Sequence, residues 1–252
     1  MDLNLRERVA VITGGATGIG EAIARALSAE GSTICILDRN AEAAHKTASA
    51  IAESSAPACA AAADVADVAA VKRVIAEFVA SFKRIDILVN AAGLLSTGPA
   101  ADLPAAEWQK LSAVNLTGVL YCTQAAIPFM RQQRYGRIIN IASVAAMRGG
   151  GTVGNALYGA TKAGVVALTM GFARELGPHA ITVNAIAPAI ADTAMTRAVL
   201  TDEVRSKVLE RIPLRRLTTP ADIADLAVFL ASARASFISG AVIPVDGGIL
   251  TT

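Results

Sequence analysis

The sequence has few aromatic residues, few histidines and few cysteines. Phe, Trp and Tyr make up 4% of the 252 residues, and there are two histidines and three cysteines. The cysteines, Cys35, Cys59 and Cys122, are odd in number and widely spaced, which fits neither a disulfide framework nor a metal-binding motif. Two histidines also argue against a histidine-based metal site. We therefore predict no bound metal and free thiols, as in a reducing cytoplasm.

The sequence also has no excess of charge of one sign. It contains 23 basic and 21 acidic residues, so neither nucleic acid nor an anionic membrane is an expected partner. No uninterrupted apolar run reaches the roughly 18 residues of a membrane-spanning helix. The first residues include Asp2, Arg6, Glu7 and Arg8 and do not read as a secretory signal. These features predict a cytoplasmic protein that does not enter a membrane.

The residues that are abundant indicate a folded α/β protein. Hydrophobic residues make up 54% of the chain and charged residues 17%, the opposite of the balance in disordered proteins. Short apolar strands without alternation indicate burial on both faces, and their regular exchange with helices predicts a parallel sheet between helix layers. We predict one domain over residues 1–252, with strands over 8–13, 32–37, 58–63, 85–90, 137–143, 181–186 and 242–245 and helices over 20–30, 41–53, 68–82, 104–131, 157–176, 202–211 and 220–230. Residues 187–220 form the longest irregular stretch, which predicts a lid over the site.

A glycine-rich loop follows the first predicted strand. Residues 13–20 read Thr-Gly-Gly-Ala-Thr-Gly-Ile-Gly, with glycines at 14, 18 and 20, and they open the first helix. Glycines allow close approach of a pyrophosphate, which a helix N-terminus favours. Asp38 ends the second strand twenty residues after Gly18, where a carboxylate can bind both hydroxyls of an adenosine ribose and repel a 2′-phosphate. Arg39 could instead pair with that phosphate, but we expect Asp38 to decide in favour of NAD. The alternative for Asp38 is a helix cap for the segment beginning at Ala41.

A second group of residues could carry chemistry. Tyr158 and Lys162 are four residues apart and share one face of a helix. An ammonium beside a phenol favours the phenolate, so we expect Lys162 to lower the pKa of Tyr158. Ser143 ends the preceding strand. Asn115 lies in the middle of a predicted helix and is followed by poor helix formers, which indicates a distorted turn there. Each residue alone also has an ordinary structural interpretation.

Together these residues resemble the short-chain dehydrogenase/reductase family over essentially the whole chain. The resemblance implies a Rossmann-type doubly wound parallel sheet of about seven strands, an NAD(P)-dependent oxidoreductase and a homotetramer whose C-terminal segment makes a second interface. The matching motifs are Thr13-Gly14-x-x-x-Gly18-Ile19-Gly20, Asp64-Val65, Asn90-Ala91-Ala92-Gly93, Asn115, Ser143, Tyr158-x-x-x-Lys162, Asn184-x-x-x-Pro188, Thr193, Ser239-Gly240 and Val245-Asp246-Gly247-Gly248.

The resemblance also implies roles for individual residues. Tyr158 would donate and accept the proton, while Lys162 would lower the pKa of Tyr158 and hold the nicotinamide ribose. Ser143 would bind the substrate oxygen, and Asn115 would hold a water molecule of a proton relay. The residues implied for cofactor binding are Gly14, Thr17, Gly18, Ile19, Gly20, Asp38, Arg39, Asp64, Val65, Asn90, Ala91, Gly93, Tyr158, Lys162, Pro188, Ala191 and Thr193.

Two departures from the family pattern bear on the substrate. The usual Pro-Gly is Pro188-Ala189 here, which adds a methyl group where the chain passes the nicotinamide. The distance from Ser143 to Tyr158 is slightly longer than usual, and the extra length falls in the glycine-rich residues 149–154. Other candidates for the pocket are Leu95, Met147, Asn155, Leu157, Ala189 and Met195.

The predicted reaction is hydride transfer between NAD(H) and a secondary alcohol or ketone. The preferred substrates are a small polyol, a sugar derivative or a hydroxy acid, and Arg148 either binds a substrate carboxylate or structures its loop. One alternative is an NADPH-dependent 3-oxoacyl-[acyl-carrier-protein] reductase, with Arg134 and Arg174 as docking residues. A second alternative is a non-catalytic regulator that senses a dinucleotide on the same fold.

Small residues recur along the predicted helix over 157–176. Ala160, Gly164, Ala167 and Gly171 form a stripe nearly opposite Tyr158. Because glycine weakens a helix, close packing against another helix would explain the stripe. We predict that a second copy of the chain packs there across a two-fold axis. The alternative is an internal contact with the helix that begins at Pro104.

Overall fold

A seven-stranded parallel sheet forms the centre of the molecule. The structure is a computed structural model and describes residues 2–251. Every paired strand runs parallel to its neighbour, and the order confirms a doubly wound Rossmann-type sheet. In that order the strands are β3 (Ala58–Ala62), β2 (Thr33–Asp38), β1 (Val9–Thr13), β4 (Ile87–Asn90), β5 (Gly136–Ile141), β6 (Ile181–Pro188) and β7 (Val242–Val245).

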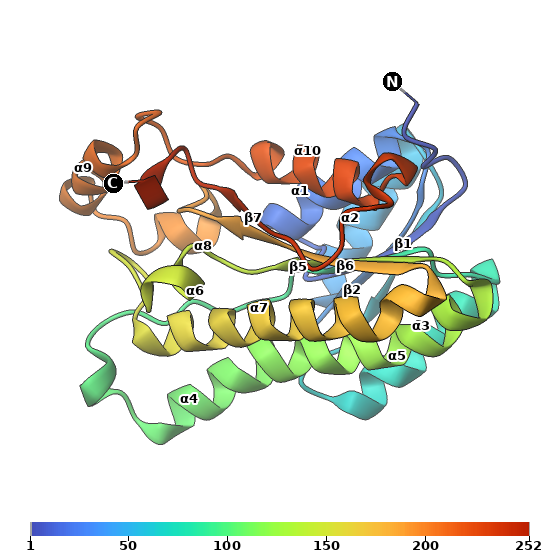
Figure 1. The fold of residues 1–252 in the computed structure, drawn as a ribbon, viewed down its shortest axis with the longest axis horizontal. Helices are drawn as coiled ribbons and strands as arrows, with labels where there is room; N and C mark the ends of the chain where they lie inside the picture. The colour runs from blue at the N-terminus through green and yellow to red at the C-terminus, as the bar shows by residue number, and fades with distance from the viewer. Residues whose placement is uncertain (1, 252) are drawn as a thin grey trace.

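Helices cover both faces of the sheet (Figure 1). On one face the sheet forms a hydrophobic core with α1, α2 and α10. On the other face it forms hydrophobic cores with α3, α5 and α7. The predicted strands and long helices are confirmed apart from shifts at their ends and one helix discussed below. The helices of at least eight residues are α1 (Gly18–Ala29), α2 (Ala41–Ser54), α3 (Val68–Phe82), α4 (Ala105–Ser112), α5 (Gly118–Gln133), α7 (Ala156–Leu176), α9 (Asp202–Arg211) and α10 (Pro220–Ala231).

The predicted continuous helix over residues 104–131 is wrong in one respect. It consists of α4, one π-helical turn (Ala113–Thr117) and α5. A π turn is wider than an α turn and turns a side chain toward a new direction. Asn115 lies within this turn and is fully buried, so the predicted distortion at Asn115 is confirmed.

Two helices of four residues each were not predicted. They are α6 (Ala145–Arg148), which follows β5, and α8 (Ala194–Arg197), which lies in the expected lid. Figure 1 places α6, α8 and α9 at the same end of the molecule, beyond the carboxyl ends of the strands. The residues between β6 and α10 pack with the C-terminal turn around Ile249 in a separate small core. Movement of residues 187–220 as a lid stays a prediction.

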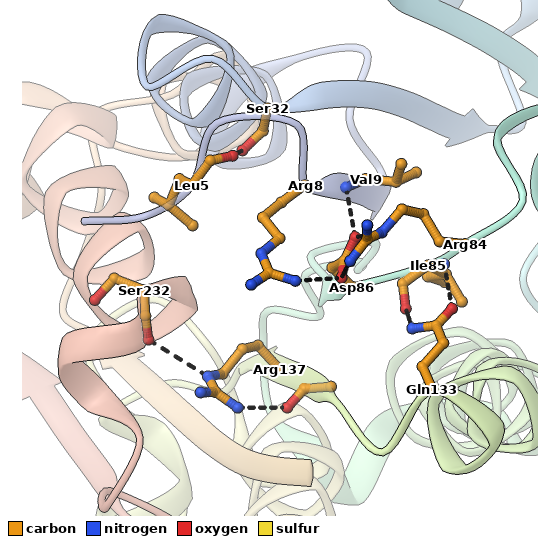
Figure 2. A network of polar contacts seen from close by, with 11 residues as sticks. Leu5, Arg8, Val9, Ser32, Arg84, Ile85, Asp86, Gln133, Arg137 and Ser232 are labelled. Atoms are coloured by element: carbon orange, nitrogen blue, oxygen red, sulfur yellow. Dashed lines mark hydrogen bonds and ion pairs between the residues drawn. The ribbon is translucent and has the colours of Figure 1, made fainter. Parts of the chain in front are cut away.

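A polar network lies at the opposite edge of the sheet, where the strands begin (Figure 2). The buried carboxylate of Asp86 accepts hydrogen bonds from Arg8, Arg84 and the backbone N–H of Val9 at distances between 2.6 and 3.0 Å. Arg137 is also buried and donates to the backbone carbonyls of Gly136 and Ser232. These contacts join the starts of β1, β4 and β5, far from the carboxyl ends of the same strands.

One helical stretch, Ala156–His179, meets the length and composition of a membrane span. The most apolar 18 residues of this stretch have a mean hydropathy of 1.2, and 28% of them are buried. The stretch contains α7, whose buried residues include Lys162, Val165 and Thr169 and which packs on β6. We therefore interpret α7 as a helix of the sandwich with an exposed apolar face.

Candidate active site

A cleft opens at the carboxyl ends of the strands, where parallel α/β sheets bind their ligands. The residues predicted for catalysis or cofactor binding line this cleft, except Asn90 and Asn115. Of the predicted pocket residues, Leu95, Ala189 and Met195 line it, whereas Met147, Asn155 and Leu157 do not. The lining residues predicted for catalysis or cofactor binding are Gly14, Thr17, Gly18, Ile19, Gly20, Asp38, Arg39, Asp64, Val65, Ala91, Gly93, Ser143, Tyr158, Lys162, Pro188, Ala191 and Thr193.

The glycine loop forms an open cradle at the start of α1. Gly14 and Gly18 have positive φ angles of 64° and 60°, which favour glycine. A Cβ at Gly14 would lie 2.7 Å from the backbone of Ala92. The hydroxyl oxygen Oγ1 of Thr13 holds this segment in place by accepting hydrogen bonds from the backbone N–H groups of Ala91 and Ala92. A side chain at either glycine would therefore strain the loop. At Gly14 it would also collide with the backbone of Ala92, in the segment that follows β4.

The N-terminus of α1 fits the phosphates of a dinucleotide. Its N-cap residue, Thr17, makes no side-chain capping hydrogen bond, so the first N–H groups of the helix remain available to a ligand. A Cβ placed at Gly18 would lie 3.7 Å from the side chain of Thr193, across the cleft. Gly18 and Thr193 thus lie close together across the cleft, and binding of a pyrophosphate beside them stays a prediction.

Asp38 lies at the tip of β2 and points back toward the glycine loop. Its carboxylate accepts hydrogen bonds from the backbone N–H groups of Ala16, at 3.2 Å, and Asn40, at 3.0 Å. The cap of α2 is Asn40, which accepts from the N–H of Ala43, so the capping alternative for Asp38 is wrong. Arg39 also lines the cleft and is exposed. Both residues that could select between NAD and NADP thus face the same end of the cleft.

Ser143, Tyr158 and Lys162 come together at the other end of the cleft. Lys162 is buried, and its Nζ donates to the carbonyl of Ile141 at 2.7 Å and lies 5.9 Å from the centre of the Tyr158 ring. Ser143 is two residues beyond the end of β5, and its Oγ accepts from the N–H of Ala145. The side chain of Asn155 caps α7 by accepting from the N–H of Tyr158, which fixes the start of this helix.

The expected lowering of the Tyr158 pKa by Lys162 is wrong for this structure. Removal from water raises the pKa of Tyr158, and a hydrogen bond with Ser143 acts in the opposite direction. Removal from water also lowers the pKa of Lys162, to about 8. Burial penalises the charged form of each group and is the largest cause of both shifts.

Asn115 lies behind this constellation and does not reach the cleft. Its Oδ1 accepts from the N–H of Leu94 at 2.7 Å, and its Nδ2 donates to the carbonyl of Leu94 and to Thr161 Oγ1. The amide therefore holds the segment after β4 against α7. Asn115 also lies beside Gly93, as Lys162 does. This placement suits a residue that supports the cleft from behind and not one that contacts the substrate.

Asn90 points away from the predicted ribose site. It is 2% exposed, and its Nδ2 donates to Asn140 Oδ1 at 2.8 Å and to Thr123 Oγ1 at 3.2 Å. Asn140 in turn donates to Thr169. The pleat of β4 thus turns this side chain into the α5–α7 layer, and the position of Asn90 along a cofactor ribose stays a prediction.

Several lining residues were not predicted from the sequence. Arg211 comes from α9, donates to Thr152 Oγ1 at 3.0 Å and lines the cleft together with Ile249. Arg148, which the sequence predicted either to bind a substrate carboxylate or to structure its loop, also lines the cleft and donates to the carbonyl of Ile249 at 3.2 Å. These residues are far apart in the sequence, so no motif joins them.

Comparisons with known proteins agree with this architecture. The family model described as enoyl-(acyl carrier protein) reductase matches residues 14–250. The uncharacterized short-chain type dehydrogenase/reductase y4mP of Sinorhizobium fredii is 40% identical over 98% of both chains. The 3-oxoacyl-[acyl-carrier-protein] reductase FabG of Aquifex aeolicus is 38% identical over 99% of this chain and 100% of its own.

A solved structure gives the same result. A Beutenbergia cavernae protein assigned as an NAD(P)-dependent gluconate 5-dehydrogenase, with NADP bound at low occupancy, superposes with a TM-score of 0.94, 36% identity and complete coverage of both chains. The chain therefore belongs to the short-chain dehydrogenase/reductase family. It is an oxidoreductase of a family that uses a nicotinamide dinucleotide.

Proposed function

We propose that the protein transfers a hydride between NAD(H) and a secondary alcohol or ketone. The observation that carries this proposal is the position of Ser143, Tyr158 and Lys162 in the same cleft as the glycine loop and Asp38. The bound nicotinamide would supply or accept the hydride. Substitution of Tyr158 by Phe tests the proposal, because it removes the proton but little of the ring. We expect a loss of most of kcat with NADH binding nearly intact, and activity within about tenfold of the wild type would contradict the assignment.

In the proposed mechanism the side chains position the substrate oxygen and move its proton. In the reduction direction the Tyr158 hydroxyl donates its proton to the carbonyl oxygen, and the Ser143 hydroxyl donates a hydrogen bond to the same oxygen. The raised pKa of Tyr158 keeps the phenol protonated and suits this direction. Lys162 holds the nicotinamide ribose and favours the phenolate once the proton has left. Asn115 holds the π turn and Leu94 in place behind Lys162, where a water molecule could return the proton.

The choice of NAD over NADP is the second part of the proposal. Asp38 supports it, because a carboxylate at the tip of β2 binds ribose hydroxyls and repels a 2′-phosphate. Arg39 beside it is the competing influence. Steady-state kcat/KM with both cofactors tests this directly, and a preference for NADP would show that Arg39 decides.

The proposed substrate is a small polyol, a sugar derivative or a hydroxy acid. Arg148 and Arg211 line the cleft near Ile249 and favour a substrate with a carboxylate, such as a sugar acid. The similarity to a protein assigned as a gluconate dehydrogenase supports the same class. The test is NADH formation with a panel of polyols, sugars, hydroxy acids and 3-hydroxyacyl thioesters. Activity restricted to neutral alcohols would exclude a role for the two arginines in substrate binding.

The second candidate is a 3-oxoacyl-[acyl-carrier-protein] reductase. The 38% identity to FabG favours it, and Arg134 and Arg174 are both exposed, as docking residues would be. Asp38 argues against it, since this alternative was expected to use NADPH. Rapid NADPH oxidation with an acetoacetyl thioester, and none with the small hydroxy compounds, would favour this candidate.

We also propose a homotetramer in a reducing compartment such as the cytoplasm. Ala160, Ala167 and Met170 on α7 are exposed, and Gly171 has no atom within 4 Å of a Cβ placed on it, so this face could meet a second copy. Gly164 differs, because a Cβ there would lie 2.8 Å from Leu116 of the same chain. The predicted stripe therefore divides into an internal contact at Gly164 and an exposed apolar part. The fully exposed Phe237 is the candidate for the second interface.

A further inference from the structure

Two cysteine thiols lie side by side near one edge of the sheet. Cys35 in β2 and Cys59 in β3 are register partners, and their Sγ atoms share a hydrogen bond at 3.5 Å. Both side chains lie on the face covered by α3, where Cys35 belongs to the core and Cys59 packs against it. We propose that Cys35 and Cys59 form a redox modification site, which a peroxide converts reversibly into an intramolecular disulfide.

The backbone geometry permits this bond. Neighbouring strands lie about 4.7–4.9 Å apart, within the roughly 4.4–6.8 Å between the Cα atoms of disulfide-bonded cysteines. The sulfur atoms must approach from contact distance to about 2.05 Å. β3 is the outer strand and pairs only with β2, so it can shift toward its single neighbour. The strand spacing is shorter than the roughly 5.5–6 Å commonest for disulfide-bonded cysteines, so the bond would strain this strand pair, and strained disulfides are easily reduced.

The two thiols differ in the way that a stepwise oxidation requires. Cys59 is half-buried, while Cys35 is fully buried. The hydrogen bond with Cys35 lowers the pKa of Cys59 although burial opposes this, and the same contact together with burial raises the pKa of Cys35. Both the exposure and the direction of these shifts favour attack by Cys59, the cysteine that a small oxidant can reach. By contrast, burial alone raises the pKa of Cys122 to about 12.

The chemistry balances with hydrogen peroxide as the oxidant. The Cys59 thiolate attacks one peroxide oxygen, so that an S–O bond forms, the O–O bond breaks, and the leaving hydroxide takes up a proton as water. The Cys35 sulfur then attacks the sulfur of the Cys59 sulfenic acid. An S–S bond forms, the S–O bond breaks, and the second oxygen leaves as water with the proton of Cys35. Two thiols and one peroxide thus give one disulfide and two waters.

The bond would act on the cleft through the strands that carry it. Asp38, at the end of β2, is the register partner of Ala62 at the end of β3, and Asp38 and Asp64 line the cleft. Strain across the β2–β3 pair would change the spacing of these residues. We therefore expect the oxidised protein to bind NADH more weakly, a consequence that rests on the proposed function, whereas the disulfide itself does not.

The test uses the whole protein with a small excess of hydrogen peroxide. After free thiols are blocked with N-ethylmaleimide, peptide mass spectrometry should find a Cys35–Cys59 linkage that dithiothreitol removes. Cys122→Ser, the matched control, should give the same linkage. Cys59→Ser should give none, and Cys35→Ser should leave a Cys59 sulfenic acid that dimedone traps.

Two results would overturn the proposal. The first is a wild-type protein in which Cys59 is oxidised to a sulfinic acid or links to another chain without bonding to Cys35. The second is a linkage that dithiothreitol cannot reduce in the folded protein. NADH binding, followed by fluorescence, should weaken on oxidation of the wild type and of Cys122→Ser but not of Cys59→Ser. An equal loss in Cys59→Ser would refute the link to the cleft, while absence of dehydrogenase activity would affect only the proposed function.

Discussion

The ring of Tyr158 packs directly on the backbone of Gly154, so a single methyl group there should displace the proposed proton donor. A Cβ added at Gly154 would lie 2.6 Å from Cδ1 and 3.2 Å from Cε1 of Tyr158. Carbon atoms in contact prefer about 3.5–4.0 Å. Gly154 does not have a positive φ, so alanine is compatible with its backbone and the collision with the ring is the main effect.

The size of the effect follows from this overlap. To restore contact distance the ring or the loop must move by about 1 Å, and a misplacement of about 1 Å can cost about 100-fold in rate. We expect Gly154→Ala to lower kcat/KM by about 10- to 100-fold, or about 1.4–2.7 kcal/mol of transition-state stabilisation. Binding of NADH should change little, because the glycine loop and Asp38 lie at the other end of the cleft.

Gly151 provides the matched control. It lies in the same loop, has no atom within 4 Å of a Cβ placed on it, and also lacks a positive φ. Steady-state kinetics of Gly151→Ala and Gly154→Ala, with thermal unfolding to confirm folding, separate the two cases. If Gly154→Ala keeps kcat/KM within about threefold of Gly151→Ala, the position of the Tyr158 ring does not control the reaction.

Four further outcomes are expected. Asp38→Ser should weaken the preference of kcat/KM for NAD over NADP, because Arg39 then meets the 2′-phosphate without the opposing carboxylate. Burial lowers the pKa of Lys162 from 10.5 to about 8, so between these pH values the unfolded chain binds more protons than the folded protein. The unfolding free energy of the wild type, measured in urea, should therefore rise by up to about 3 kcal/mol relative to that of Lys162→Met as the pH increases through this range. Gly171→Arg should break the oligomer in light scattering but leave the fold intact, and a wild-type monomer at micromolar concentration would refute the proposed assembly. Asp86→Ala should cost about 1–3 kcal/mol in unfolding free energy, because it leaves the buried N–H of Val9 without its acceptor while Arg8 and Arg84 keep partial contact with water, with kcat unchanged.

The sequence alone was sufficient for the features that depend on neighbouring residues. The glycine loop was recognisable because it follows a strand and opens a helix, and Tyr158 and Lys162 share a helix face because the α-helix repeats every 3.6 residues. The unfavourable run after Asn115 was enough to predict a distorted turn, and the structure has a π turn there. Short apolar strands between helices were enough to predict a parallel sheet between helix layers, and the resemblance to the family implied its doubly wound order.

Only the tertiary structure decided features that depend on residues distant in the chain. Gly164 meets Leu116 and Asn90 points into the core because of how α7 and β4 are oriented against their neighbours. Cys35 and Cys59 meet because β2 and β3 pair in one particular register, and a shift of one residue would turn one thiol to the opposite face. The pKa of Tyr158 rises because atoms from several parts of the chain remove the ring from water. A sequence motif records which groups are present, whereas burial and register arise only when the whole chain is packed.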